Sequence, residues 1–155
     1  MNAEKRLQDL GLVLAAPPAA VANYVAAVKT GHLLVISGQL PFGPDGALSQ
    51  HHKGKLGRDV FNEAGQEAAR LCALNVLAQV RAALGSLNEV RRCVKIGGFV
   101  NSSPGFTAIP AVVNGASDLM VAVFGDAGRH ARFAVGVAEL PLDAAVEIEA
   151  MFEVK

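Results

Sequence analysis

The sequence predicts an α+β fold in which two helices pack on one face of a mostly antiparallel sheet. Over residues 59–84, apolar residues recur at three- and four-residue steps, the period of an amphipathic helix. Near the C-terminus they alternate instead with small or charged residues, which is typical of a half-buried strand. The predicted order is strand, strand, helix, strand, helix, strand, strand, and it favours helices layered against one sheet. A chain of 155 residues fits one domain spanning 1–155.

The beginning of the chain, about residues 1–22, is predicted to be a short N-terminal extension of this domain. Ala3 to Leu10 is a candidate helix that ends at Gly11. An extended connector that contains Pro17 and Pro18 follows it.

The first three strands are predicted from apolar runs bounded by turn residues. Tyr24–Lys29 and His32–Ser37 form a candidate hairpin, and Thr30 and Gly31 supply its tight turn because glycine readily adopts a positive φ. The third strand is Arg91–Val100, which is rich in Val, Ile and Phe after its basic start.

Two helices are predicted between these strands and the C-terminal ones. Asp59–Leu84 has the clearest helical period, and Gly85 fits the position just past its end. Thr107–Phe124 is a second helix if Pro110 lies in its first turn. Gly115 then falls inside the helix, where glycine costs about 1 kcal/mol relative to alanine. A glycine there indicates close packing of the backbone against a neighbour.

The last two strands, within Arg132–Val154, are predicted to pair as a hairpin around the corner at Leu140 to Asp143. Because side chains alternate along a strand, Arg132 and Glu147 are expected to share the face that points away from the core. The predicted core positions of the first of these strands are Phe133, Val135 and Val137, and the non-core positions are Arg132, Ala134, Gly136 and Ala138. The charges either form a solvated salt bridge, worth about 0–1 kcal/mol, or line a pocket for a small charged molecule.

Composition limits the classes of function. Lys plus Arg total 14 and Asp plus Glu total 14, so the formal net charge is zero, and there is no tryptophan. This argues against a nucleic-acid partner, which would require a basic surface and stacking aromatics. A composition that is 52% hydrophobic and only 18% charged favours a homo-oligomer. His51 and His52 are adjacent and without further ligands at metal-binding spacing, so they are expected to be solvated.

The compartment is predicted from the cysteines and from the absence of targeting patterns. Cys72 and Cys93 fall in apolar segments and are expected to be buried, reduced thiols. No leader-like start and no apolar run of membrane-spanning length is seen. We therefore expect a cytoplasmic protein with no membrane partner.

Four segments carry a resemblance to a known family: "YVAAV", "ISGQLP", "ARFAVGVAELP" and "VEIEAMFEV". In this order and spacing they resemble the reactive-intermediate deaminase family, also known as the YjgF family, whose members are often labelled L-PSP endoribonucleases. The resemblance implies a chorismate-mutase-like fold and a homotrimer with a pocket at each subunit interface. It also implies hydrolysis of 2-imino acids, such as 2-aminoacrylate, to 2-keto acids and ammonia without a metal or cofactor.

The resemblance assigns roles to particular residues. The carboxylate-binding arginine of the family falls on Arg132 and its pocket glutamate on Glu147. The positions implied to bind the substrate are Tyr24, Ser37, Gly38, Asn114 and Ala134.

Several of these residues also have a purely structural interpretation. Glu147 would be an ordinary strand charge, Tyr24 an aromatic that fills a subunit interface, and Ser37 a side chain that satisfies a strand end. Asn114 would cap a restarted helical segment. His130, two residues before Arg132, is a candidate for the pocket mouth or a bystander.

Departures from the family pattern leave the activity open. Many deaminating members carry a cysteine at the position of Ala134, and the stretch "IPAVVNGASDLMVAVFG" differs from the usual helix. Both features resemble a divergent subgroup. Besides the deaminase, two functions therefore stay in view: binding of a small carboxylate or keto acid without turnover, and an endoribonuclease. The zero net charge argues against the endoribonuclease.

Overall fold

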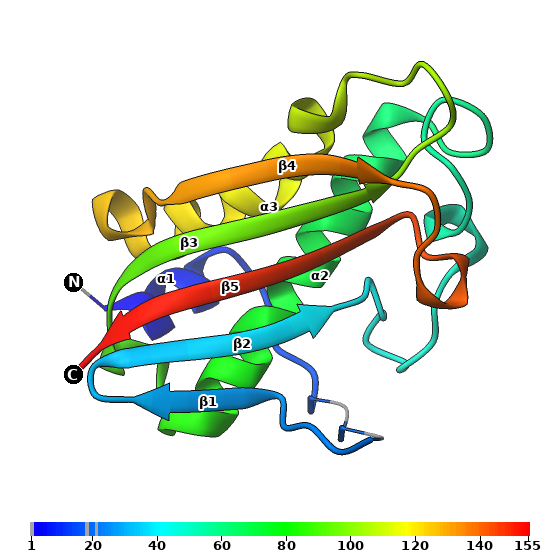
Figure 1. Ribbon diagram of the computed structural model, residues 1–155. Helices are drawn as coiled ribbons and strands as arrows, with labels where there is room; N and C mark the ends of the chain where they lie inside the picture. The colour runs from blue at the N-terminus through cyan, green and yellow to red at the C-terminus, as the bar shows by residue number, and fades with distance from the viewer. Residues whose placement is uncertain (1, 18, 21) are drawn as a thin grey trace.

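The computed structural model describes residues 2–17, 19–20 and 22–155, and it confirms the α+β class (Figure 1). Residues 1, 18 and 21 of the predicted N-terminal extension lie outside the described residues. The strands are β1 (Ala27–Thr30), β2 (Leu33–Gln39), β3 (Val90–Asn101), β4 (Ala131–Val137) and β5 (Val146–Val154). The α-helices are α1 (Ala3–Asp9), α2 (Asn62–Leu84) and α3 (Ile109–Phe124), and short 3₁₀ turns η1 (Gln50–His52), η2 (Leu87–Glu89), η3 (Gly125–Gly128) and η4 (Pro141–Asp143) join them.

The five strands form one sheet in the order β1-β2-β5-β3-β4. All neighbours are antiparallel except β3 and β4, which are parallel and connected through α3. The predicted hairpin of the last two strands is therefore wrong, because β3 lies between β4 and β5. The corner at Leu140 to Asp143 is a wide 3₁₀ connection and not a tight turn, and Leu142 and Asp143 adopt positive φ within it.

The two long helices cover one face of the sheet, and none of the helices in the described residues lies over the other face (Figure 1). The helix-side positions of β5 alternate strictly with its open-face positions, as predicted for this strand. The helices bury an apolar core against Leu34, Ile36, Ile96, Ile148 and Phe152.

The N-terminal segment adds a third helix to the two that were expected for the layer. Ala3 and Leu7 of α1 are buried in the same core, and α1 contacts α3. Gly11 follows the helix with a φ of 70°, as predicted. Helix α1 of the extension is thus packed against the fold, whereas Val13 after it is exposed.

Local signals place the two long helices well. Pro110 lies in the first turn of α3, and Gly85 ends α2 in the left-handed conformation. A Cβ at Gly115 would clash with the backbone carbonyl of Gln66, so the predicted close approach is confirmed and brings α2 against α3. Helix α2 begins at Asn62 and not at Asp59, because the Asp59 carboxylate accepts the Lys55 amide and holds a turn there.

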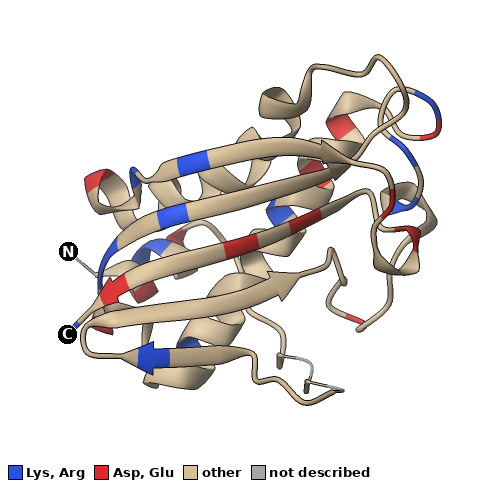
Figure 2. Cartoon of the chain, viewed as in Figure 1, with Lys and Arg blue, Asp and Glu red and all other residues tan. Residues whose placement is uncertain are grey.

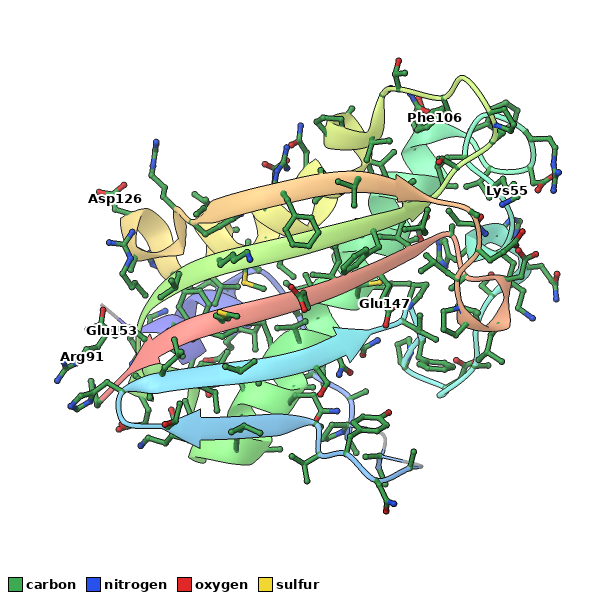
Figure 3. All side chains as sticks on the ribbon, in the orientation of Figure 1. Lys55, Arg91, Phe106, Asp126, Glu147 and Glu153 are labelled. Atoms are coloured by element: carbon green, nitrogen blue, oxygen red, sulfur yellow. The ribbon has the colours of Figure 1, made fainter. Side chains whose placement is uncertain are left out.

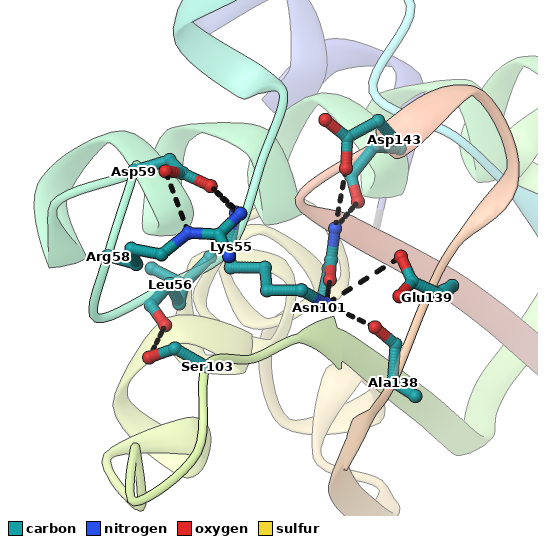
Figure 4. Close-up of polar contacts among 10 residues, drawn as sticks. Lys55, Leu56, Arg58, Asp59, Asn101, Ser103, Ala138, Glu139 and Asp143 are labelled. Atoms are coloured by element: carbon teal, nitrogen blue, oxygen red, sulfur yellow. Dashed lines mark hydrogen bonds and ion pairs between the residues drawn. The ribbon is translucent and has the colours of Figure 1, made fainter.

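A partly buried lysine, Lys55, connects the loops at one end of the sheet (Figure 4). Lys55 Nζ donates to Asn101 Oδ1 at 2.8 Å and to the carbonyl of Ala138, and it lies 3.7 Å from Glu139. Asn101 in turn donates to Asp143 Oδ1 at 3.2 Å. This network joins the ends of β3, β4 and the connection before β5.

Two smaller expectations fail. The β1–β2 hairpin turns at Gly31 and His32, since Thr30 is still paired with Leu33. His52 is buried and not solvated; its Nε2 lies 3.6 Å from Glu67 Oε2, while its backbone carbonyl accepts from Ala145.

Candidate functional site

Arg132 points toward the helix layer from the edge strand β4. Its Nη1 donates to Asn114 Oδ1 at 2.8 Å and to Ser117 Oγ at 3.2 Å, both on α3. Its pairing partner on β3, Ile96, is fully buried on the same face. The predicted alternation along this strand is correct, but the faces are reversed. Phe133 and Val135 lie on the open face, where Phe133 packs against Phe99 and Val135 pairs with it.

The contacts of Arg132 leave one edge of its guanidinium for a ligand. Within the described part of the chain, hydrogen bonds engage only Nη1. The Nε–Nη2 edge therefore presents two parallel N–H groups, the arrangement that holds a carboxylate bidentately. Ala134, the next residue on this face, is partly buried and packs against the core.

Asn114 lies within the continuous helix α3, so it does not cap a restarted segment. Its amide instead orients Arg132, and this brings two of the predicted site residues together. Ser117 was missed by the sequence analysis. Its position three residues after Asn114, on the same helix face, is the signal that would have indicated it.

His130 completes this group from the end of η3. Its Nε2 lies 2.9 Å from Ser117 Oγ, and its Nδ1 lies 2.6 Å from the carbonyl of Gly128. Burial lowers the pKa of His130, the nearby charge of Arg132 lowers it further, and the Gly128 hydrogen bond opposes both. The imidazole is therefore neutral at neutral pH. The groups gathered here, Asn114, Ser117, His130, Arg132 and Ala134, are called the arginine cluster below.

Glu147 lies on the open face of β5, as predicted (Figure 3). Its carboxylate sits directly against Gly38 of β2, where any Cβ would clash with it. Gly38 belongs to a β-bulge, since Ile36 pairs with Ala150 and Gln39 with Ile148. The bulge and the absence of a side chain at Gly38 together leave the space that the Glu147 carboxylate occupies.

The environment of Glu147 favours its neutral form. Burial raises the pKa of this carboxyl, and the negative charge of Glu149 raises it further. A carboxyl whose pKa is raised toward neutrality is better suited to proton transfer than a fully solvated one.

Ser37 and Tyr24 lie beside this bulge. Ser37 Oγ donates to the carbonyl of Val25 at 2.8 Å, which fixes the segment before β1. Tyr24 is the residue before Val25 and is 53% exposed. It precedes β1, the strand in which it was expected, because β1 begins at Ala27. The hydroxyl of Ser37 thus has the structural role foreseen as its alternative. The group of Tyr24, Ser37, Gly38 and Glu147 is called the glutamate cluster below.

The two clusters are not brought together within one chain. Arg132 faces the helices from β4, whereas Glu147 faces the open side from β5, and β3 separates the two strands. Figure 2 shows the same separation in charge, with basic positions on β3 and β4 and acidic positions along β5. Residues 2–17, 19–20 and 22–155 contain no group of three His, Cys, Asp or Glu side chains placed to hold a metal ion. In the same residues, no helix is long and apolar enough to cross a membrane.

A helix-covered, largely antiparallel sheet with an arginine at its edge and a carboxylate seated on a bulge defines a chorismate-mutase-like α+β protein. A family model described as "YjgF/chorismate mutase-like, putative endoribonuclease" matches residues 4–153. The chain belongs to this YjgF family.

Individual relatives agree with the family match. Protein TCP17 of Trypanosoma cruzi is 52% identical over 148 residues, which cover 95% of this chain and 91% of that protein. The crystal structure of Atu1372 from Agrobacterium tumefaciens, a protein described as of unknown function, is 48% identical. It superposes with a TM-score of 0.88 over 99% of this chain and 92% of that one. The YjgF gene product of E. coli is 30% identical, with a TM-score of 0.65 over 92% of this chain and 98% of that one.

Proposed function

We propose that the protein hydrolyses reactive 2-imino acids to 2-keto acids and ammonia, without a metal or cofactor. The observation that carries this proposal is the fixed guanidinium of Arg132, whose Nε–Nη2 edge suits the carboxylate of such a substrate. In this proposal the whole chain, residues 1–155, acts as one cytoplasmic domain.

The separation of the two clusters supports a site shared between subunits. The arginine cluster lies at the edge of the sheet and the glutamate cluster on its open face, so a neighbouring copy would have to supply the missing half. The open face carries apolar side chains that are unusually exposed for a sheet, including Val28 at 50% and Val135 at 42%. A homotrimer would cover this face and join the clusters of adjacent subunits.

The mechanism assigns each cluster a task. Arg132 clamps the substrate carboxylate, and backbone groups near Ala134 and at Ser37 and Gly38 orient the imine. Glu147 positions and deprotonates a water molecule that attacks the imine carbon. Glu147 then gives this proton to the nitrogen of the resulting carbinolamine, and the C–N bond breaks. Ammonia carries away the hydroxyl proton as the carbonyl of the keto acid forms. Positioning and electrostatics suffice, because a protonated imine is already electrophilic.

The test generates imino acids with an amino-acid oxidase and traps the remainder with semicarbazide. Native protein is expected to reduce the trapped product, while Arg132→Ala loses this effect. Arg132→Lys is the matched control, since it keeps the charge but loses the bidentate fork, and it is expected to recover only a small part of the activity. An inert native protein across several imino acids would contradict the deaminase proposal.

Binding without turnover is the second candidate, and Ala134 is the feature that favours it. If the native protein does not consume imines, calorimetric titration with 2-keto acids measures whether the pocket still binds a carboxylate. Binding that requires Arg132 would support this alternative. The zero net charge continues to argue against an endoribonuclease.

A further inference from the structure

Ser117 and His130 form a hydrogen-bonded pair that the proposed deaminase mechanism does not use. The hydroxyl oxygen and the imidazole Nε2 are 2.9 Å apart, and both residues are only partly buried. Ser117 belongs to α3 and His130 precedes β4, so the pair bridges the helix layer and the edge strand. A serine and a histidine at this distance have the separation of an activated nucleophile and its base.

The second ring nitrogen fixes the direction of the hydrogen bonds. The Gly128 carbonyl can only accept, so Nδ1, 2.6 Å away, carries the proton and donates. Nε2 of the neutral ring is then the acceptor, and the Ser117 hydroxyl donates to it. The Ser117 hydroxyl, the His130 imidazole and the Gly128 carbonyl therefore form a continuous series of hydrogen bonds. They correspond to a nucleophile, its base and the group that orients the base, which here is a backbone carbonyl.

Arg132 places a cation beside the same hydroxyl. Its Nη1 donates to Ser117 Oγ at 3.2 Å, which favours the alkoxide character that develops as the hydroxyl loses its proton. The Nε–Nη2 edge of the same guanidinium suits a carboxylate, so an acyl group held next to Ser117 would carry a free carboxylate elsewhere in the molecule.

We propose that Ser117 is a nucleophile activated by His130 and that the arginine cluster hydrolyses small oxygen esters that carry a free carboxylate. Ser117 Oγ bonds to the ester carbon while its proton passes to His130 Nε2. The alkoxide leaving group breaks away and takes that proton, which leaves an acyl-serine. A water molecule then gives its proton to His130 and attacks the acyl carbon. Release of the acid returns the proton to Ser117 Oγ.

This activity does not depend on the deaminase reaction, and it needs no residue of the glutamate cluster. The pair lies within one chain, so the acylation step is available to each subunit. The proposal gives a role in acyl transfer to Ser117, a residue to which the family resemblance assigned none.

The experiment treats native protein with a fluorophosphonate and measures covalent addition by mass spectrometry with peptide mapping. We expect Ser117 to be the labelled residue, and His130→Gln to slow labelling by about 100-fold or more, the usual contribution of a general base. Ser103 is the internal control, because its hydroxyl is also partly buried but donates to the Leu56 carbonyl at 2.9 Å instead of to a histidine.

Substrate preference is tested on native protein with mono-p-nitrophenyl succinate and p-nitrophenyl acetate. We expect faster release of nitrophenolate from the succinate monoester, and Arg132→Gln should remove that preference. Two results overturn the proposal: native Ser117 labelled no faster than Ser103, or native protein that releases nitrophenolate no faster than Ser117→Ala. The native labelling result requires no variant to fold, and neither result depends on whether imines are consumed.

Discussion

At the scale of single residues, the fold places two ionisable groups, Glu147 and His130, where their charged forms are disfavoured. Glu147 is a carboxylate partly removed from water beside another carboxylate, and His130 is an imidazole partly removed from water beside a guanidinium. Groups of this kind cost folding free energy when they are charged, and they cluster where chemistry occurs. Both belong to the clusters that the proposed functions use.

Replacing Glu147 by glutamine is expected to stabilise the protein at neutral pH. The pKa of Glu147 is raised in the folded state above its ordinary value of 4.5, so ionisation opposes folding. The penalty is absent below pH 4.5 and is complete once the pH has risen through the folded-state value. The gap in unfolding free energy between Glu147→Gln and native protein should therefore open as pH rises, as measured by urea denaturation at several pH values.

The control for this comparison is Glu153→Gln on the same face of β5. Glu153 lies 3.8 Å from Arg91 in an exposed ion pair, so its replacement should lower stability by at most about 1 kcal/mol. A gap for Glu147→Gln that stays constant from pH 4 to pH 8 would show that burial does not penalise this carboxylate.

The two cysteines are expected to resist alkylation in the native state. Burial raises the pKa of Cys93 to about 12 and that of Cys72 well above the ordinary range, so neither forms a thiolate at pH 8. Iodoacetamide should leave both unmodified in native protein and modify both in urea, as measured by intact mass. Rapid modification without urea would contradict the burial of these side chains.

At the scale of elements, local patterns predicted most of the structure and long-range pairing did not follow from them. The alternation in β5 and the end of α2 at Gly85 are local features, and both were confirmed. The glycine within α3 also correctly indicated a close approach, but it did not indicate that Gln66 of α2 is the neighbour. The pairing of the final strands was wrong, because β3 inserts between them. The period of apolar residues identifies a strand and its buried face, but it does not indicate which other strand pairs with it.

The site shows the same limit. The alternation along β4 was right, but Arg132 faces α3, where the side chains of Asn114 and Ser117 accept hydrogen bonds from its guanidinium. The family resemblance indicated Arg132 and Asn114, and the structure places them in contact. Ser117 and the neighbourhood of His130 depend on how α3 and η3 pack, which no single segment encodes.

Gly115→Ala is expected to destabilise the contact between α2 and α3. On helix propensity alone the substitution would gain about 1 kcal/mol. The added methyl group would clash with the backbone carbonyl of Gln66, which cannot rotate away as a side chain can. We expect a net loss of about 1–3 kcal/mol in chemical denaturation.

The matched control for this change is Ala122→Gly on an exposed position of the same helix. It should cost about 1 kcal/mol through propensity alone. A stabilised Gly115→Ala would mean that the two helices can separate without loss, and the close approach would then not be a constraint on the fold.

Lys55→Met tests the loop network at the end of the sheet. The ammonium group satisfies Asn101 Oδ1 and the Ala138 carbonyl, and Asn101 is fully buried (Figure 4). Methionine keeps the volume but leaves these acceptors unpaired, which should cost about 1–3 kcal/mol. Lys53→Met is the control on a neighbouring position and should change the unfolding free energy by less than about 0.5 kcal/mol.

At the scale of the whole molecule, the proposed homotrimer is supported by the distribution of apolar surface. One face of the sheet is covered by α2 and α3, whereas Val28, Phe133 and Val135 lie on the face without helices. An uncovered sheet face of this kind is typical of a subunit interface, and assembly through it would also bring the clusters of different copies together.

Val135→Lys is therefore expected to dissociate the assembly and to abolish imine hydrolysis. A lysine on the open face of β4 would place an ammonium group in an apolar contact with no partner, which costs several kcal/mol per buried charge. Multi-angle light scattering should give about three times 16.0 kDa for native protein and 16.0 kDa for the variant. Val121→Lys is the matched control, because Val121 is similarly exposed, at 39% against 42%, but lies on α3 at the helix side. If both variants keep the native mass, the open face is not the subunit contact. If Val135→Lys is monomeric yet hydrolyses imines at the native rate, one chain must hold the complete site, and the shared-site proposal fails.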